Sequence, residues 1–423
     1  MLASSARRAL VACGRQATAT STLSRRSVWP AFSRSLSVEA KVLSYDTRGD
    51  TITIAEEVKT LSAPSGNEAL VKFLAAPITR ADYDVIHAKG EISTTLETKE
   101  VAVRFAKAQE VGVLDPLAGV LSKLPALPAV GGIQGVAEVQ EVGPSVKGLK
   151  AGDWVLPPVG AGTWRSHALM PEDSLVTVPS DIPMEYAAVL GVSPCAALRM
   201  LEDFASLKEG DVIVLNGANG LVGQTLVQLA AARGVRTVAV MRGRQGYEEL
   251  CPHLVTRGAT VVISENWSKD AHMKSLMAEL PPPSLGLDAC GGSSGAAVAN
   301  LLPKGATLVK YGSASGKPFR VAAERDLKVQ TFFLSEWEAA HSKDDKQIMI
   351  STLAHMVRDK SLQLLLERAF FDKHKTALKL GAEMMRDRQL VMCMAEPQLE
   401  VFPEDLWEMA ADKARLGLAS AEQ

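Results

Sequence analysis

Asp211–Met241 reads DVIVLNGANGLVGQTLVQLAAARGVRTVAVM, and this stretch decides the fold. Two short apolar runs rich in β-branched residues, at 211–216 and 237–241, predict buried strands. Residues 224–233 between them have helical composition, and Gly234 ends the predicted helix. A strand, a glycine-rich turn, a helix and a second strand in this order predict a dinucleotide-binding unit. The alternative is an ordinary unit of this shape whose glycines serve only packing.

Three glycines in the turn have distinct expected roles. Gly217 suits the tight turn, Gly220 lets a pyrophosphate approach the backbone, and Gly223 lets the helix pack closely on the strand. The turn points backbone N–H groups at an anion, and the amino end of the helix adds a favourable dipole. The expected ligand group is therefore a pyrophosphate.

The end of the second strand indicates which dinucleotide is bound. A site for NAD usually places an acidic residue here for the ribose hydroxyls, whereas arginine accommodates a 2′-phosphate. The chain continues with Arg242-Gly243-Arg244 and has no carboxylate before Glu248. Because each guanidinium donates a planar fork of hydrogen bonds, the pair suits a phosphate and predicts NADPH as the cofactor. A solvated basic loop is the alternative.

Residues 1–38 differ in composition from the rest of the chain. They hold six arginines and eight serines but no Asp or Glu, and Glu39 is the first acid. An arginine- and serine-rich, acid-poor leader is typical of an organellar transit peptide. Segments such as Ala6–Val11 fit an amphipathic import helix, which favours the mitochondrial matrix over the plastid. A disordered basic tail without an address is the alternative.

The rest of the chain is acidic. The 46 basic and 48 acidic residues give a formal net charge of −2, and leaving out the six leader arginines leaves 40 basic residues and a net charge of −8. That balance gives no general case for nucleic-acid binding. No apolar run approaches ~20 residues, so no membrane span is expected. The five cysteines form no CxxC pair, which argues against a disulfide framework or a zinc knuckle.

The chain divides into a β-rich first half and a second part in which strands and helices alternate. In the first half, strands are expected at 51–54, 69–73, 135–142 and 166–170, with a turn into another strand at 151–155. A short helix is expected to open at 76–84, and an insertion is expected at about 91–122 with a helix at 97–109. From Pro183, a mostly helical stretch to Phe204 and strands at 211–216, 237–241, 260–263, 286–290, 307–311 and 329–334 predict a six-stranded parallel sheet with helices on both faces. Residues 340–423 are expected to be helical and polar, with an apolar piece at 390–394 and a short helix at 403–415.

This order of parts resembles the medium-chain dehydrogenase/reductase superfamily. Within it, the chain is most similar to the mitochondrial 2-enoyl thioester reductases, also called trans-2-enoyl-CoA or enoyl-acyl carrier protein reductases. The stretches that carry the resemblance are AAPITRADYDVI, LPALPAVGGIQGVAEVQEVG, GLKAGDWVLP, GTWRSHAL, VPSDIP, LGVSPCAALRMLEDF and FFLSEW, which lie between residues 69 and 340. The resemblance implies an α/β protein with a doubly wound Rossmann domain and a β-rich GroES-like catalytic domain.

The resemblance also implies domain boundaries. The expected parts are a transit peptide at 1–38, a catalytic GroES-like domain at 39–182 with the insertion at about 91–122, a Rossmann NADPH-binding domain at 183–334, and a return to the catalytic domain with a C-terminal tail at 335–423. Pairing of strand edges between copies, which is common in this superfamily, implies a homodimer.

Cofactor contacts carry over from the family position by position. Ser193 stands where the family has an Asn near the nicotinamide, and Leu221 stands where it has the middle glycine of the pyrophosphate turn. The implied cofactor residues are Ser193, Gly217, Gly220, Leu221, Val222, Gly223, Arg242, Gly243, Arg244, Tyr311, Gly312, Ser313, Ala314, Phe332, Phe333, Leu334 and Arg388. Zinc-dependent members carry Cys near Thr79 and Gly-His-Glu where this chain has residues 132–135, GIQG, so no metal is expected.

The chain departs from the family at the expected proton donor. The family has a Tyr shortly after the segment matching 82–90, and this chain has no Tyr from Asp84 to Glu185. Tyr83 is the nearest phenol and becomes the candidate donor. The alternative for this ring is that it packs inward at the start of a helix and has no catalytic role.

The resemblance implies that NADPH reduces the double bond of a trans-2-enoyl thioester in mitochondrial fatty acid synthesis. The substrate partner is an enoyl-CoA or an enoyl-acyl carrier protein. Two alternatives stay open because the family Tyr is absent. One is a quinone or enone reductase of the same superfamily, which needs less help from an acid. The other is a non-catalytic NADPH-binding protein.

Overall fold

The computed structural model describes residues 37–48, 53–87, 125–243, 247–269, 271–317, 319, 321, 323–382, 388–396 and 406–408. Residues 1–36 of the predicted leader and the whole predicted insertion at 91–122, including its helix, lie outside the described residues. The first strand, β1 (Val38–Tyr45), begins at the last residue of the predicted leader.

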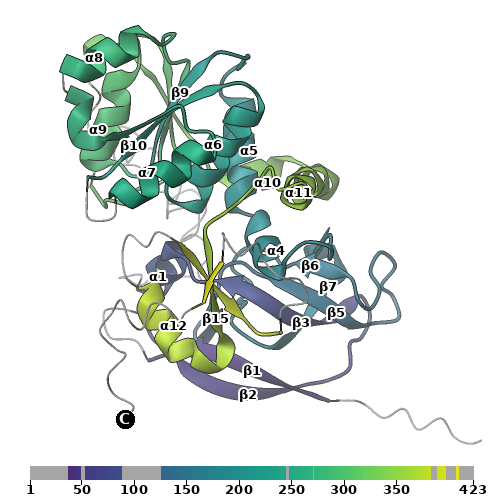
Figure 1. Ribbon diagram of the computed structural model, residues 1–423. Helices are drawn as coiled ribbons and strands as arrows, with labels where there is room; N and C mark the ends of the chain where they lie inside the picture. The colour runs from purple at the N-terminus through teal and green to yellow at the C-terminus, as the bar shows by residue number, and fades with distance from the viewer. Residues whose placement is uncertain are drawn as a thin grey trace, which may run out of the picture. The chain divides into compact units, whose positions relative to one another are not determined.

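One sheet consists of six parallel strands, which confirms the prediction (Figure 1). Its strands are β9 (Val212–Asn216), β10 (Arg236–Met241), β11 (Val261–Ser264), β12 (Leu285–Asp288), β13 (Thr307–Lys310) and β14 (Lys328–Thr331). Their order in space is β11-β10-β9-β12-β13-β14. The chain therefore builds outward from β9 in one direction and then in the other, and β9 and β12 flank the point of reversal.

Helices cover both faces of this sheet, also as predicted. Ile213 and Leu215 of β9 share an apolar cluster with Leu226 of α6, whereas Val214 of β9 shares a different cluster with Val298 of α9. Successive strand residues point to opposite faces, so α6 and α9 lie on opposite sides (Figure 1). The helices of this part are α4 (Met184–Leu190), α5 (Ser193–Asp203), α6 (Leu221–Ala232), α7 (Tyr247–Thr256), α8 (Ala271–Ala278) and α9 (Gly292–Leu301).

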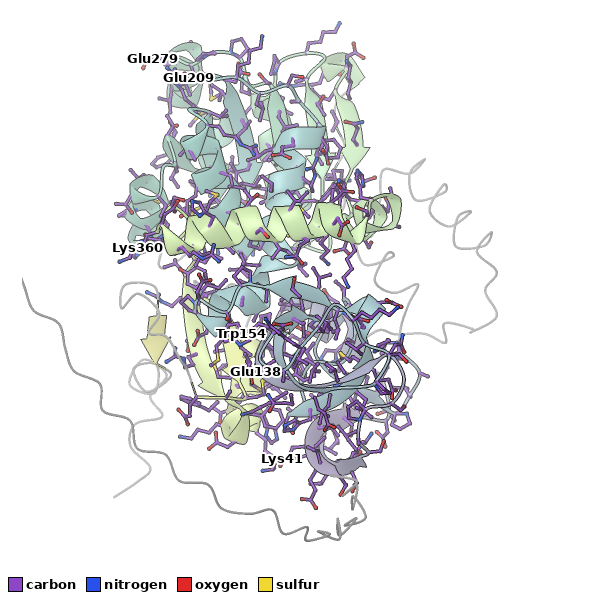
Figure 2. The ribbon with its side chains drawn as sticks, turned by 90° about the vertical axis from the view of Figure 1, so that its right-hand side faces the viewer. Lys41, Glu138, Trp154, Glu209, Glu279 and Lys360 are labelled. Carbon is purple, nitrogen blue, oxygen red and sulfur yellow. The ribbon has the colours of Figure 1, made fainter. Side chains whose placement is uncertain are left out.

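The other strands form a three-stranded sheet, ordered β2-β1-β4, and an eight-stranded sheet. They are β2 (Ala55–Leu61), β3 (Glu68–Pro77), β4 (Ala129–Val130), β5 (Val136–Val142), β6 (Trp154–Leu156), β7 (His167–Pro171), β8 (Val176–Val178), β15 (Leu366–Phe370), β16 (Gln389–Cys393) and β17 (Leu406–Glu408). Glu138 of β5 and Trp154 of β6 are direct partners in this larger sheet (Figure 2). β16 pairs antiparallel with β3, so the C-terminal part joins a sheet begun by the first half.

The remaining described helices either belong to the part with the two antiparallel-containing sheets or follow the last strand of the six-stranded sheet. They are α1 (Arg80–Ile86), α10 (Leu334–Ala340), α11 (Lys343–Arg358) and α12 (His374–Gly381). Figure 2 shows α11 along its length, with Lys360 just beyond its C-terminal end. Within the described residues, no helix combines the length and apolar character needed to span a membrane.

Three predicted elements were wrong in place or type. The strand predicted at 51–54 is not formed at 53–54, and β2 begins at Ala55. Nearly every residue of β2 is exposed, so this edge strand lacks the apolar alternation that identifies strands. In the region predicted to be helical, 366–370 and 406–408 are the parallel strands β15 and β17. Their pairing with neighbouring strands overrides local helix propensity.

Candidate active site

A cavity of about 650 Å³ lies at the carboxyl ends of the parallel strands. Its wall includes residues at or just after the ends of β9, β10, β12 and β13, namely Gly217, Met241, Ala289 and Tyr311. Other parts of the wall come from α1, α6 and the stretch that leads into β16. Ligands of open parallel sheets bind outside the carboxyl ends of the strands, where the strand order reverses. The cavity therefore occupies the place expected for a dinucleotide.

Most of the predicted site residues come together on this wall. Those that line the cavity are Tyr83, Ser193, Gly217, Gly220, Leu221, Val222, Gly223, Arg242, Tyr311, Ala314 and Arg388. Those that do not line it are Gly243, Gly312, Ser313, Phe332, Phe333 and Leu334, while Arg244 lies outside the described residues. The second group stays a set of predictions drawn from the resemblance.

The glycines of the turn after β9 are required for different reasons. Gly217 has a φ of +62°, which glycine adopts far more easily than other residues. A β-carbon at Gly223 would lie 2.5 Å from the carbonyl oxygen of Gly217 and 2.5 Å from the Cα of Ala218, so α6 approaches the turn this closely only with glycine there. A β-carbon at Gly220 would meet only the Gly217 oxygen, at an ordinary 3.4 Å. The described protein does not require glycine at 220, whereas a ligand approaching the turn would.

A buried hydrogen-bond network fixes the ends of β9 and β12 beside the turn. The side-chain amide of Asn216 donates to Asp288 Oδ1 at 2.7 Å, and its oxygen accepts from the backbone amide of Ala289 at 2.6 Å. Asp288 Oδ1 also accepts from the amide of Gly291 at 2.9 Å. Asn216 and Asp288 are both fully buried. Sequence reasoning missed this pair because neither residue carries a local signal of a partner 72 positions away.

Tyr311 presents a buried hydroxyl that has no hydrogen-bond partner among the described residues. Burial, together with the nearby Cys290 and Asp288, raises the pKa of this phenol well above its ordinary value. The hydroxyl therefore stays protonated and is able to donate. A buried donor without a partner favours a bound group that accepts its proton. This residue and the glycine turn both fit a dinucleotide cofactor.

The same wall carries positive charge and an unreactive thiol. Arg242 directly follows β10, and Arg388 directly precedes β16. Two guanidiniums on one wall favour a ligand with several phosphates. Burial raises the pKa of the Cys290 thiol to about 12, so this cysteine is a poor nucleophile at neutral pH. In the described part of the chain, no three His, Cys, Asp or Glu side chains gather as metal ligands would.

The amino end of α1 is anchored by a buried carboxylate. Asp82 accepts hydrogen bonds from the amide and the hydroxyl of Thr79, both at 2.6 Å, and from the amide of Ile133 at 2.7 Å. Burial is the main effect on Asp82 and raises its pKa to about 6, although these hydrogen bonds oppose it. The carboxylate therefore caps α1 and ties it to the loop before β5.

Tyr83 lines the cavity, but its hydroxyl donates its hydrogen bond to the protein backbone. The hydroxyl donates to the backbone carbonyl of Leu378 in α12 at 2.5 Å. Gly381 allows this approach, since a β-carbon there would lie 2.8 Å from the Tyr83 oxygen. Burial, and to a lesser degree Asp82, raises the pKa of Tyr83 above its ordinary value. The assignment of Tyr83 as proton donor stays a prediction, and it requires this hydrogen bond to break.

Sequence reasoning missed the other polar residues that α1 brings to the cavity. Arg80 and Asp84 line it and form an ion pair of 2.9 Å, and His87 lines it at the C-terminal end of the helix. The spacing of 80, 84 and 87 places these side chains on one helical face with Tyr83. That spacing was a usable signal, because the helix itself was predicted.

Comparisons with known proteins agree with this architecture. Residues 65–180 match the alcohol dehydrogenase GroES-like domain. The structure of Etr1p, a mitochondrial 2-enoyl thioester reductase, in complex with NADP and crotonyl-CoA aligns with this chain with a TM-score of 0.71 at 20% identity. The alignment covers 84% of this chain and 100% of Etr1p. The quinone oxidoreductase of Pseudomonas syringae aligns with a TM-score of 0.64 at 20% identity, covering 84% and 100%. The fold is that of the medium-chain dehydrogenase/reductase superfamily.

Sequence comparison narrows this class to one family. The mitochondrial enoyl-acyl carrier protein reductase of Homo sapiens is 38% identical over 324 residues, which are 75% of this chain and 79% of that protein. The enzyme of the same name from Arabidopsis thaliana is 33% identical over 364 residues, 83% of this chain and 88% of that protein. This chain belongs to the family of mitochondrial enoyl-acyl carrier protein reductases, which confirms the resemblance noted in its sequence.

Proposed function

We propose that this protein uses NADPH to reduce trans-2-enoyl thioesters to acyl thioesters in mitochondrial fatty acid synthesis. The observation that carries the proposal is the similarity to mitochondrial enoyl-acyl carrier protein reductases over three quarters of the chain. The cavity at the carboxyl ends of β9, β10, β12 and β13 supports it, because its wall suits a phosphate-rich dinucleotide.

The cofactor is assigned to this cavity through residues already on its wall. The turn from Gly217 to Gly223 and the amino end of α6 would hold the pyrophosphate. Arg242, with Arg244 as its predicted companion, would hold the 2′-phosphate, and the buried hydroxyl of Tyr311 would donate to the cofactor. Further proposed contacts on the wall are Ser193, Ala314 and Arg388, and the predicted contacts from Gly243, 312–313 and 332–334 complete the proposed set.

Bound NADPH supplies the hydride that reduces the β-carbon of the substrate. Negative charge then develops on the thioester oxygen, where each correctly placed hydrogen-bond donor lowers the barrier by roughly 3 kcal/mol. A proton must reach the α-carbon from a side chain or from water. The carrier of the acyl chain is coenzyme A or acyl carrier protein.

An assay of NADPH oxidation separates this function from its two alternatives. The proposal expects turnover with a series of C6 to C16 trans-2-enoyl-CoA substrates, with formation of the saturated thioesters. Turnover with a quinone but with no enoyl-CoA would favour a quinone reductase. The quinone oxidoreductase of Pseudomonas syringae has the same fold as this chain. NADPH binding without turnover of either substrate would favour a non-catalytic protein.

We also propose a location and an assembly. The arginine- and serine-rich leader and the names of the family members support import into mitochondria, with the matrix as destination. The plastid is the alternative address. A homodimer is the proposed assembly, formed where the edge strand β14 ends the six-stranded sheet.

A further inference from the structure

The cavity face of α1 carries a histidine as well as the predicted tyrosine. His87 lines the cavity and is exposed, so its imidazole contacts both the cavity and solvent. It stacks on Tyr83, with ring centroids 6.2 Å apart and planes inclined by 15°. Asp84 lies on the same helical face three residues earlier. The imidazole is therefore placed to exchange protons with water and with a molecule in the cavity.

The other acidic groups on the described wall are poorly suited to donate a proton at neutral pH. The hydroxyl of Tyr83 is engaged with a backbone carbonyl of α12, and its pKa is raised. The pKa of Cys290 is raised to about 12, and that of Tyr311 is raised well above its ordinary value. Asp84 is held in an ion pair with Arg80, whose guanidinium does not lose protons in proteins.

We infer that His87 donates the proton that completes reduction of the enoyl thioester in this cavity. The inference rests on the proposed function and adds to it the residue that replaces the family tyrosine. An imidazole is the side chain that most often acts as a general acid or base in enzymes. The charged and titratable groups on the same wall are Arg80, Tyr83 and Asp84 of α1, with Arg242, Cys290, Tyr311 and Arg388 from the other elements.

The proton transfer balances without a further reactant. The β-carbon gains the hydride, and the electrons of the carbon–carbon double bond move onto the α-carbon and the thioester oxygen as an enolate. The imidazolium of His87 gives one proton to the α-carbon and becomes neutral imidazole. Because the side chain is exposed, water returns the proton to the imidazole before the next turnover. The net change is NADPH, one proton and an enoyl thioester giving NADP⁺ and an acyl thioester.

The direct test is the variant His87→Gln in the full-length protein. We expect kcat with trans-2-hexenoyl-CoA to fall ~100-fold or more, with the dissociation constant of NADPH unchanged. The pH profile of kcat should change as well, because the proposed proton donor is gone. The matched control is His355→Gln on α11, whose side chain is 73% exposed and lies off the cavity wall. It should keep the activity and the pH profile of the unaltered protein.

Two further measurements exclude a purely structural role for His87. Added imidazole should restore at least a tenth of the activity of His87→Ala, because it returns the missing acid to the opened space. In the protein without cofactor, butyryl-CoA should shift the imidazole resonances of His87 in a ¹⁵N NMR spectrum and leave those of His355 unchanged. A purely structural histidine would show no rescue by imidazole, and a histidine remote from the bound substrate would show no shift with butyryl-CoA.

The outcomes separate this inference from the proposed function. If the unaltered protein reduces hexenoyl-CoA and His87→Gln does so within 3-fold of it, only the inference about His87 is overturned. The inference would also be overturned if Tyr83→Phe lost most of its kcat and His87→Gln lost none, because Tyr83 would then be the proton donor. If the unaltered protein reduces no enoyl thioester, the proposed function and the inference fall together.

Discussion

Arg242 is the described residue that we propose selects NADPH over NADH. It follows the last residue of β10 and lines the cavity, and Arg244 is its predicted companion. Replacing both by alanine should weaken NADPH binding ~10- to 100-fold, the equivalent of one or two charge-assisted hydrogen bonds. Binding of NADH should barely change, because it lacks the 2′-phosphate.

Cofactor titrations followed by fluorescence measure both affinities. Arg236→Ala is the matched control, since Arg236 begins the same strand at its opposite end and is exposed. It should leave both affinities unchanged. Equal affinity of the unaltered protein for NADPH and NADH would show that the two arginines do not bind the 2′-phosphate.

Gly220 and Gly223 provide a second test at the scale of single residues. A β-carbon at Gly223 collides with backbone at 2.5 Å, so Gly223→Ala should cost ~1–3 kcal/mol of unfolding free energy. Gly220 has a φ of −77°, and a β-carbon there would make one ordinary contact at 3.4 Å, so Gly220→Ala should change stability by less than ~1 kcal/mol. It should nevertheless weaken NADPH binding ~10-fold or more, because the methyl group stands where the pyrophosphate approaches.

Urea unfolding and cofactor titration of the two variants check this contrast. Gly223→Ala should lose stability, whereas Gly220→Ala should lose affinity for NADPH. Two variants that lose stability equally, while Gly220→Ala binds NADPH normally, would mean that both glycines serve only packing.

At the scale of elements, the buried carboxyl of Asp82 on α1 makes the stability of the protein depend on pH. Burial raises the pKa of this carboxyl from 3.8 to about 6, so the folded state holds the proton more tightly than the unfolded state. Its contribution to stability is fully present below about pH 4 and is lost as the pH rises to about 6 and beyond. In Asp82→Asn this contribution should be absent, so the two proteins should differ in pH dependence across that interval by up to ~1.4 kcal/mol per pH unit.

The measurement is the unfolding free energy of both proteins in urea at several values between pH 4 and 7. Asp181→Asn is an informative control, because the side-chain hydrogen bond from Arg358 lowers the pKa of Asp181. Since the folded pKa of Asp181 lies below 3.8, Asp181→Asn should leave the pH dependence between pH 4 and 7 unchanged. If the unfolding free energies of the unaltered protein and Asp82→Asn changed with pH in parallel, the raised pKa of Asp82 would be contradicted.

An element could be predicted from the sequence where the residues that stabilise it are neighbours in the chain. The strands β9 to β14 were found within three residues, because each contains a short apolar run and those of β9, β10 and β11 are rich in β-branched residues. β2 and β15 were missed, since an exposed edge and a tertiary pairing leave little trace in local sequence. In the site, the glycine turn was visible because its motif is contiguous. The Asn216–Asp288 pair was not visible, because only the folded sheet brings the two side chains together.

At the scale of the whole molecule, the six-stranded sheet ends in an edge that suits pairing with a second copy. β14 is the terminal strand, and Val329 on it is 45% exposed. An exposed strand edge offers unpaired backbone groups to another chain. The proposed homodimer uses this edge on both copies, so light scattering at micromolar concentration should give twice the mass of one chain.

A charge on the edge should separate the two copies. Val329→Lys should reduce the measured mass to that of a single chain, because edge lysines oppose strand pairing. Val58→Lys is the matched control on β2, the edge of the three-stranded sheet, where Val58 is 59% exposed. It should leave the dimer intact. A single-chain mass for the unaltered protein would refute the homodimer.

The central claim is that this protein moves a hydride from NADPH to the β-carbon of an enoyl thioester. The most direct measurement follows the hydride itself, using NADPH labelled with deuterium at either face of its C4 position and trans-2-hexenoyl-CoA. With one of the two labelled cofactors, mass spectrometry and NMR should find hexanoyl-CoA carrying a single deuterium at the β-carbon. Recovery of unchanged hexenoyl-CoA, while the same preparation oxidises NADPH with a quinone, would contradict the claim.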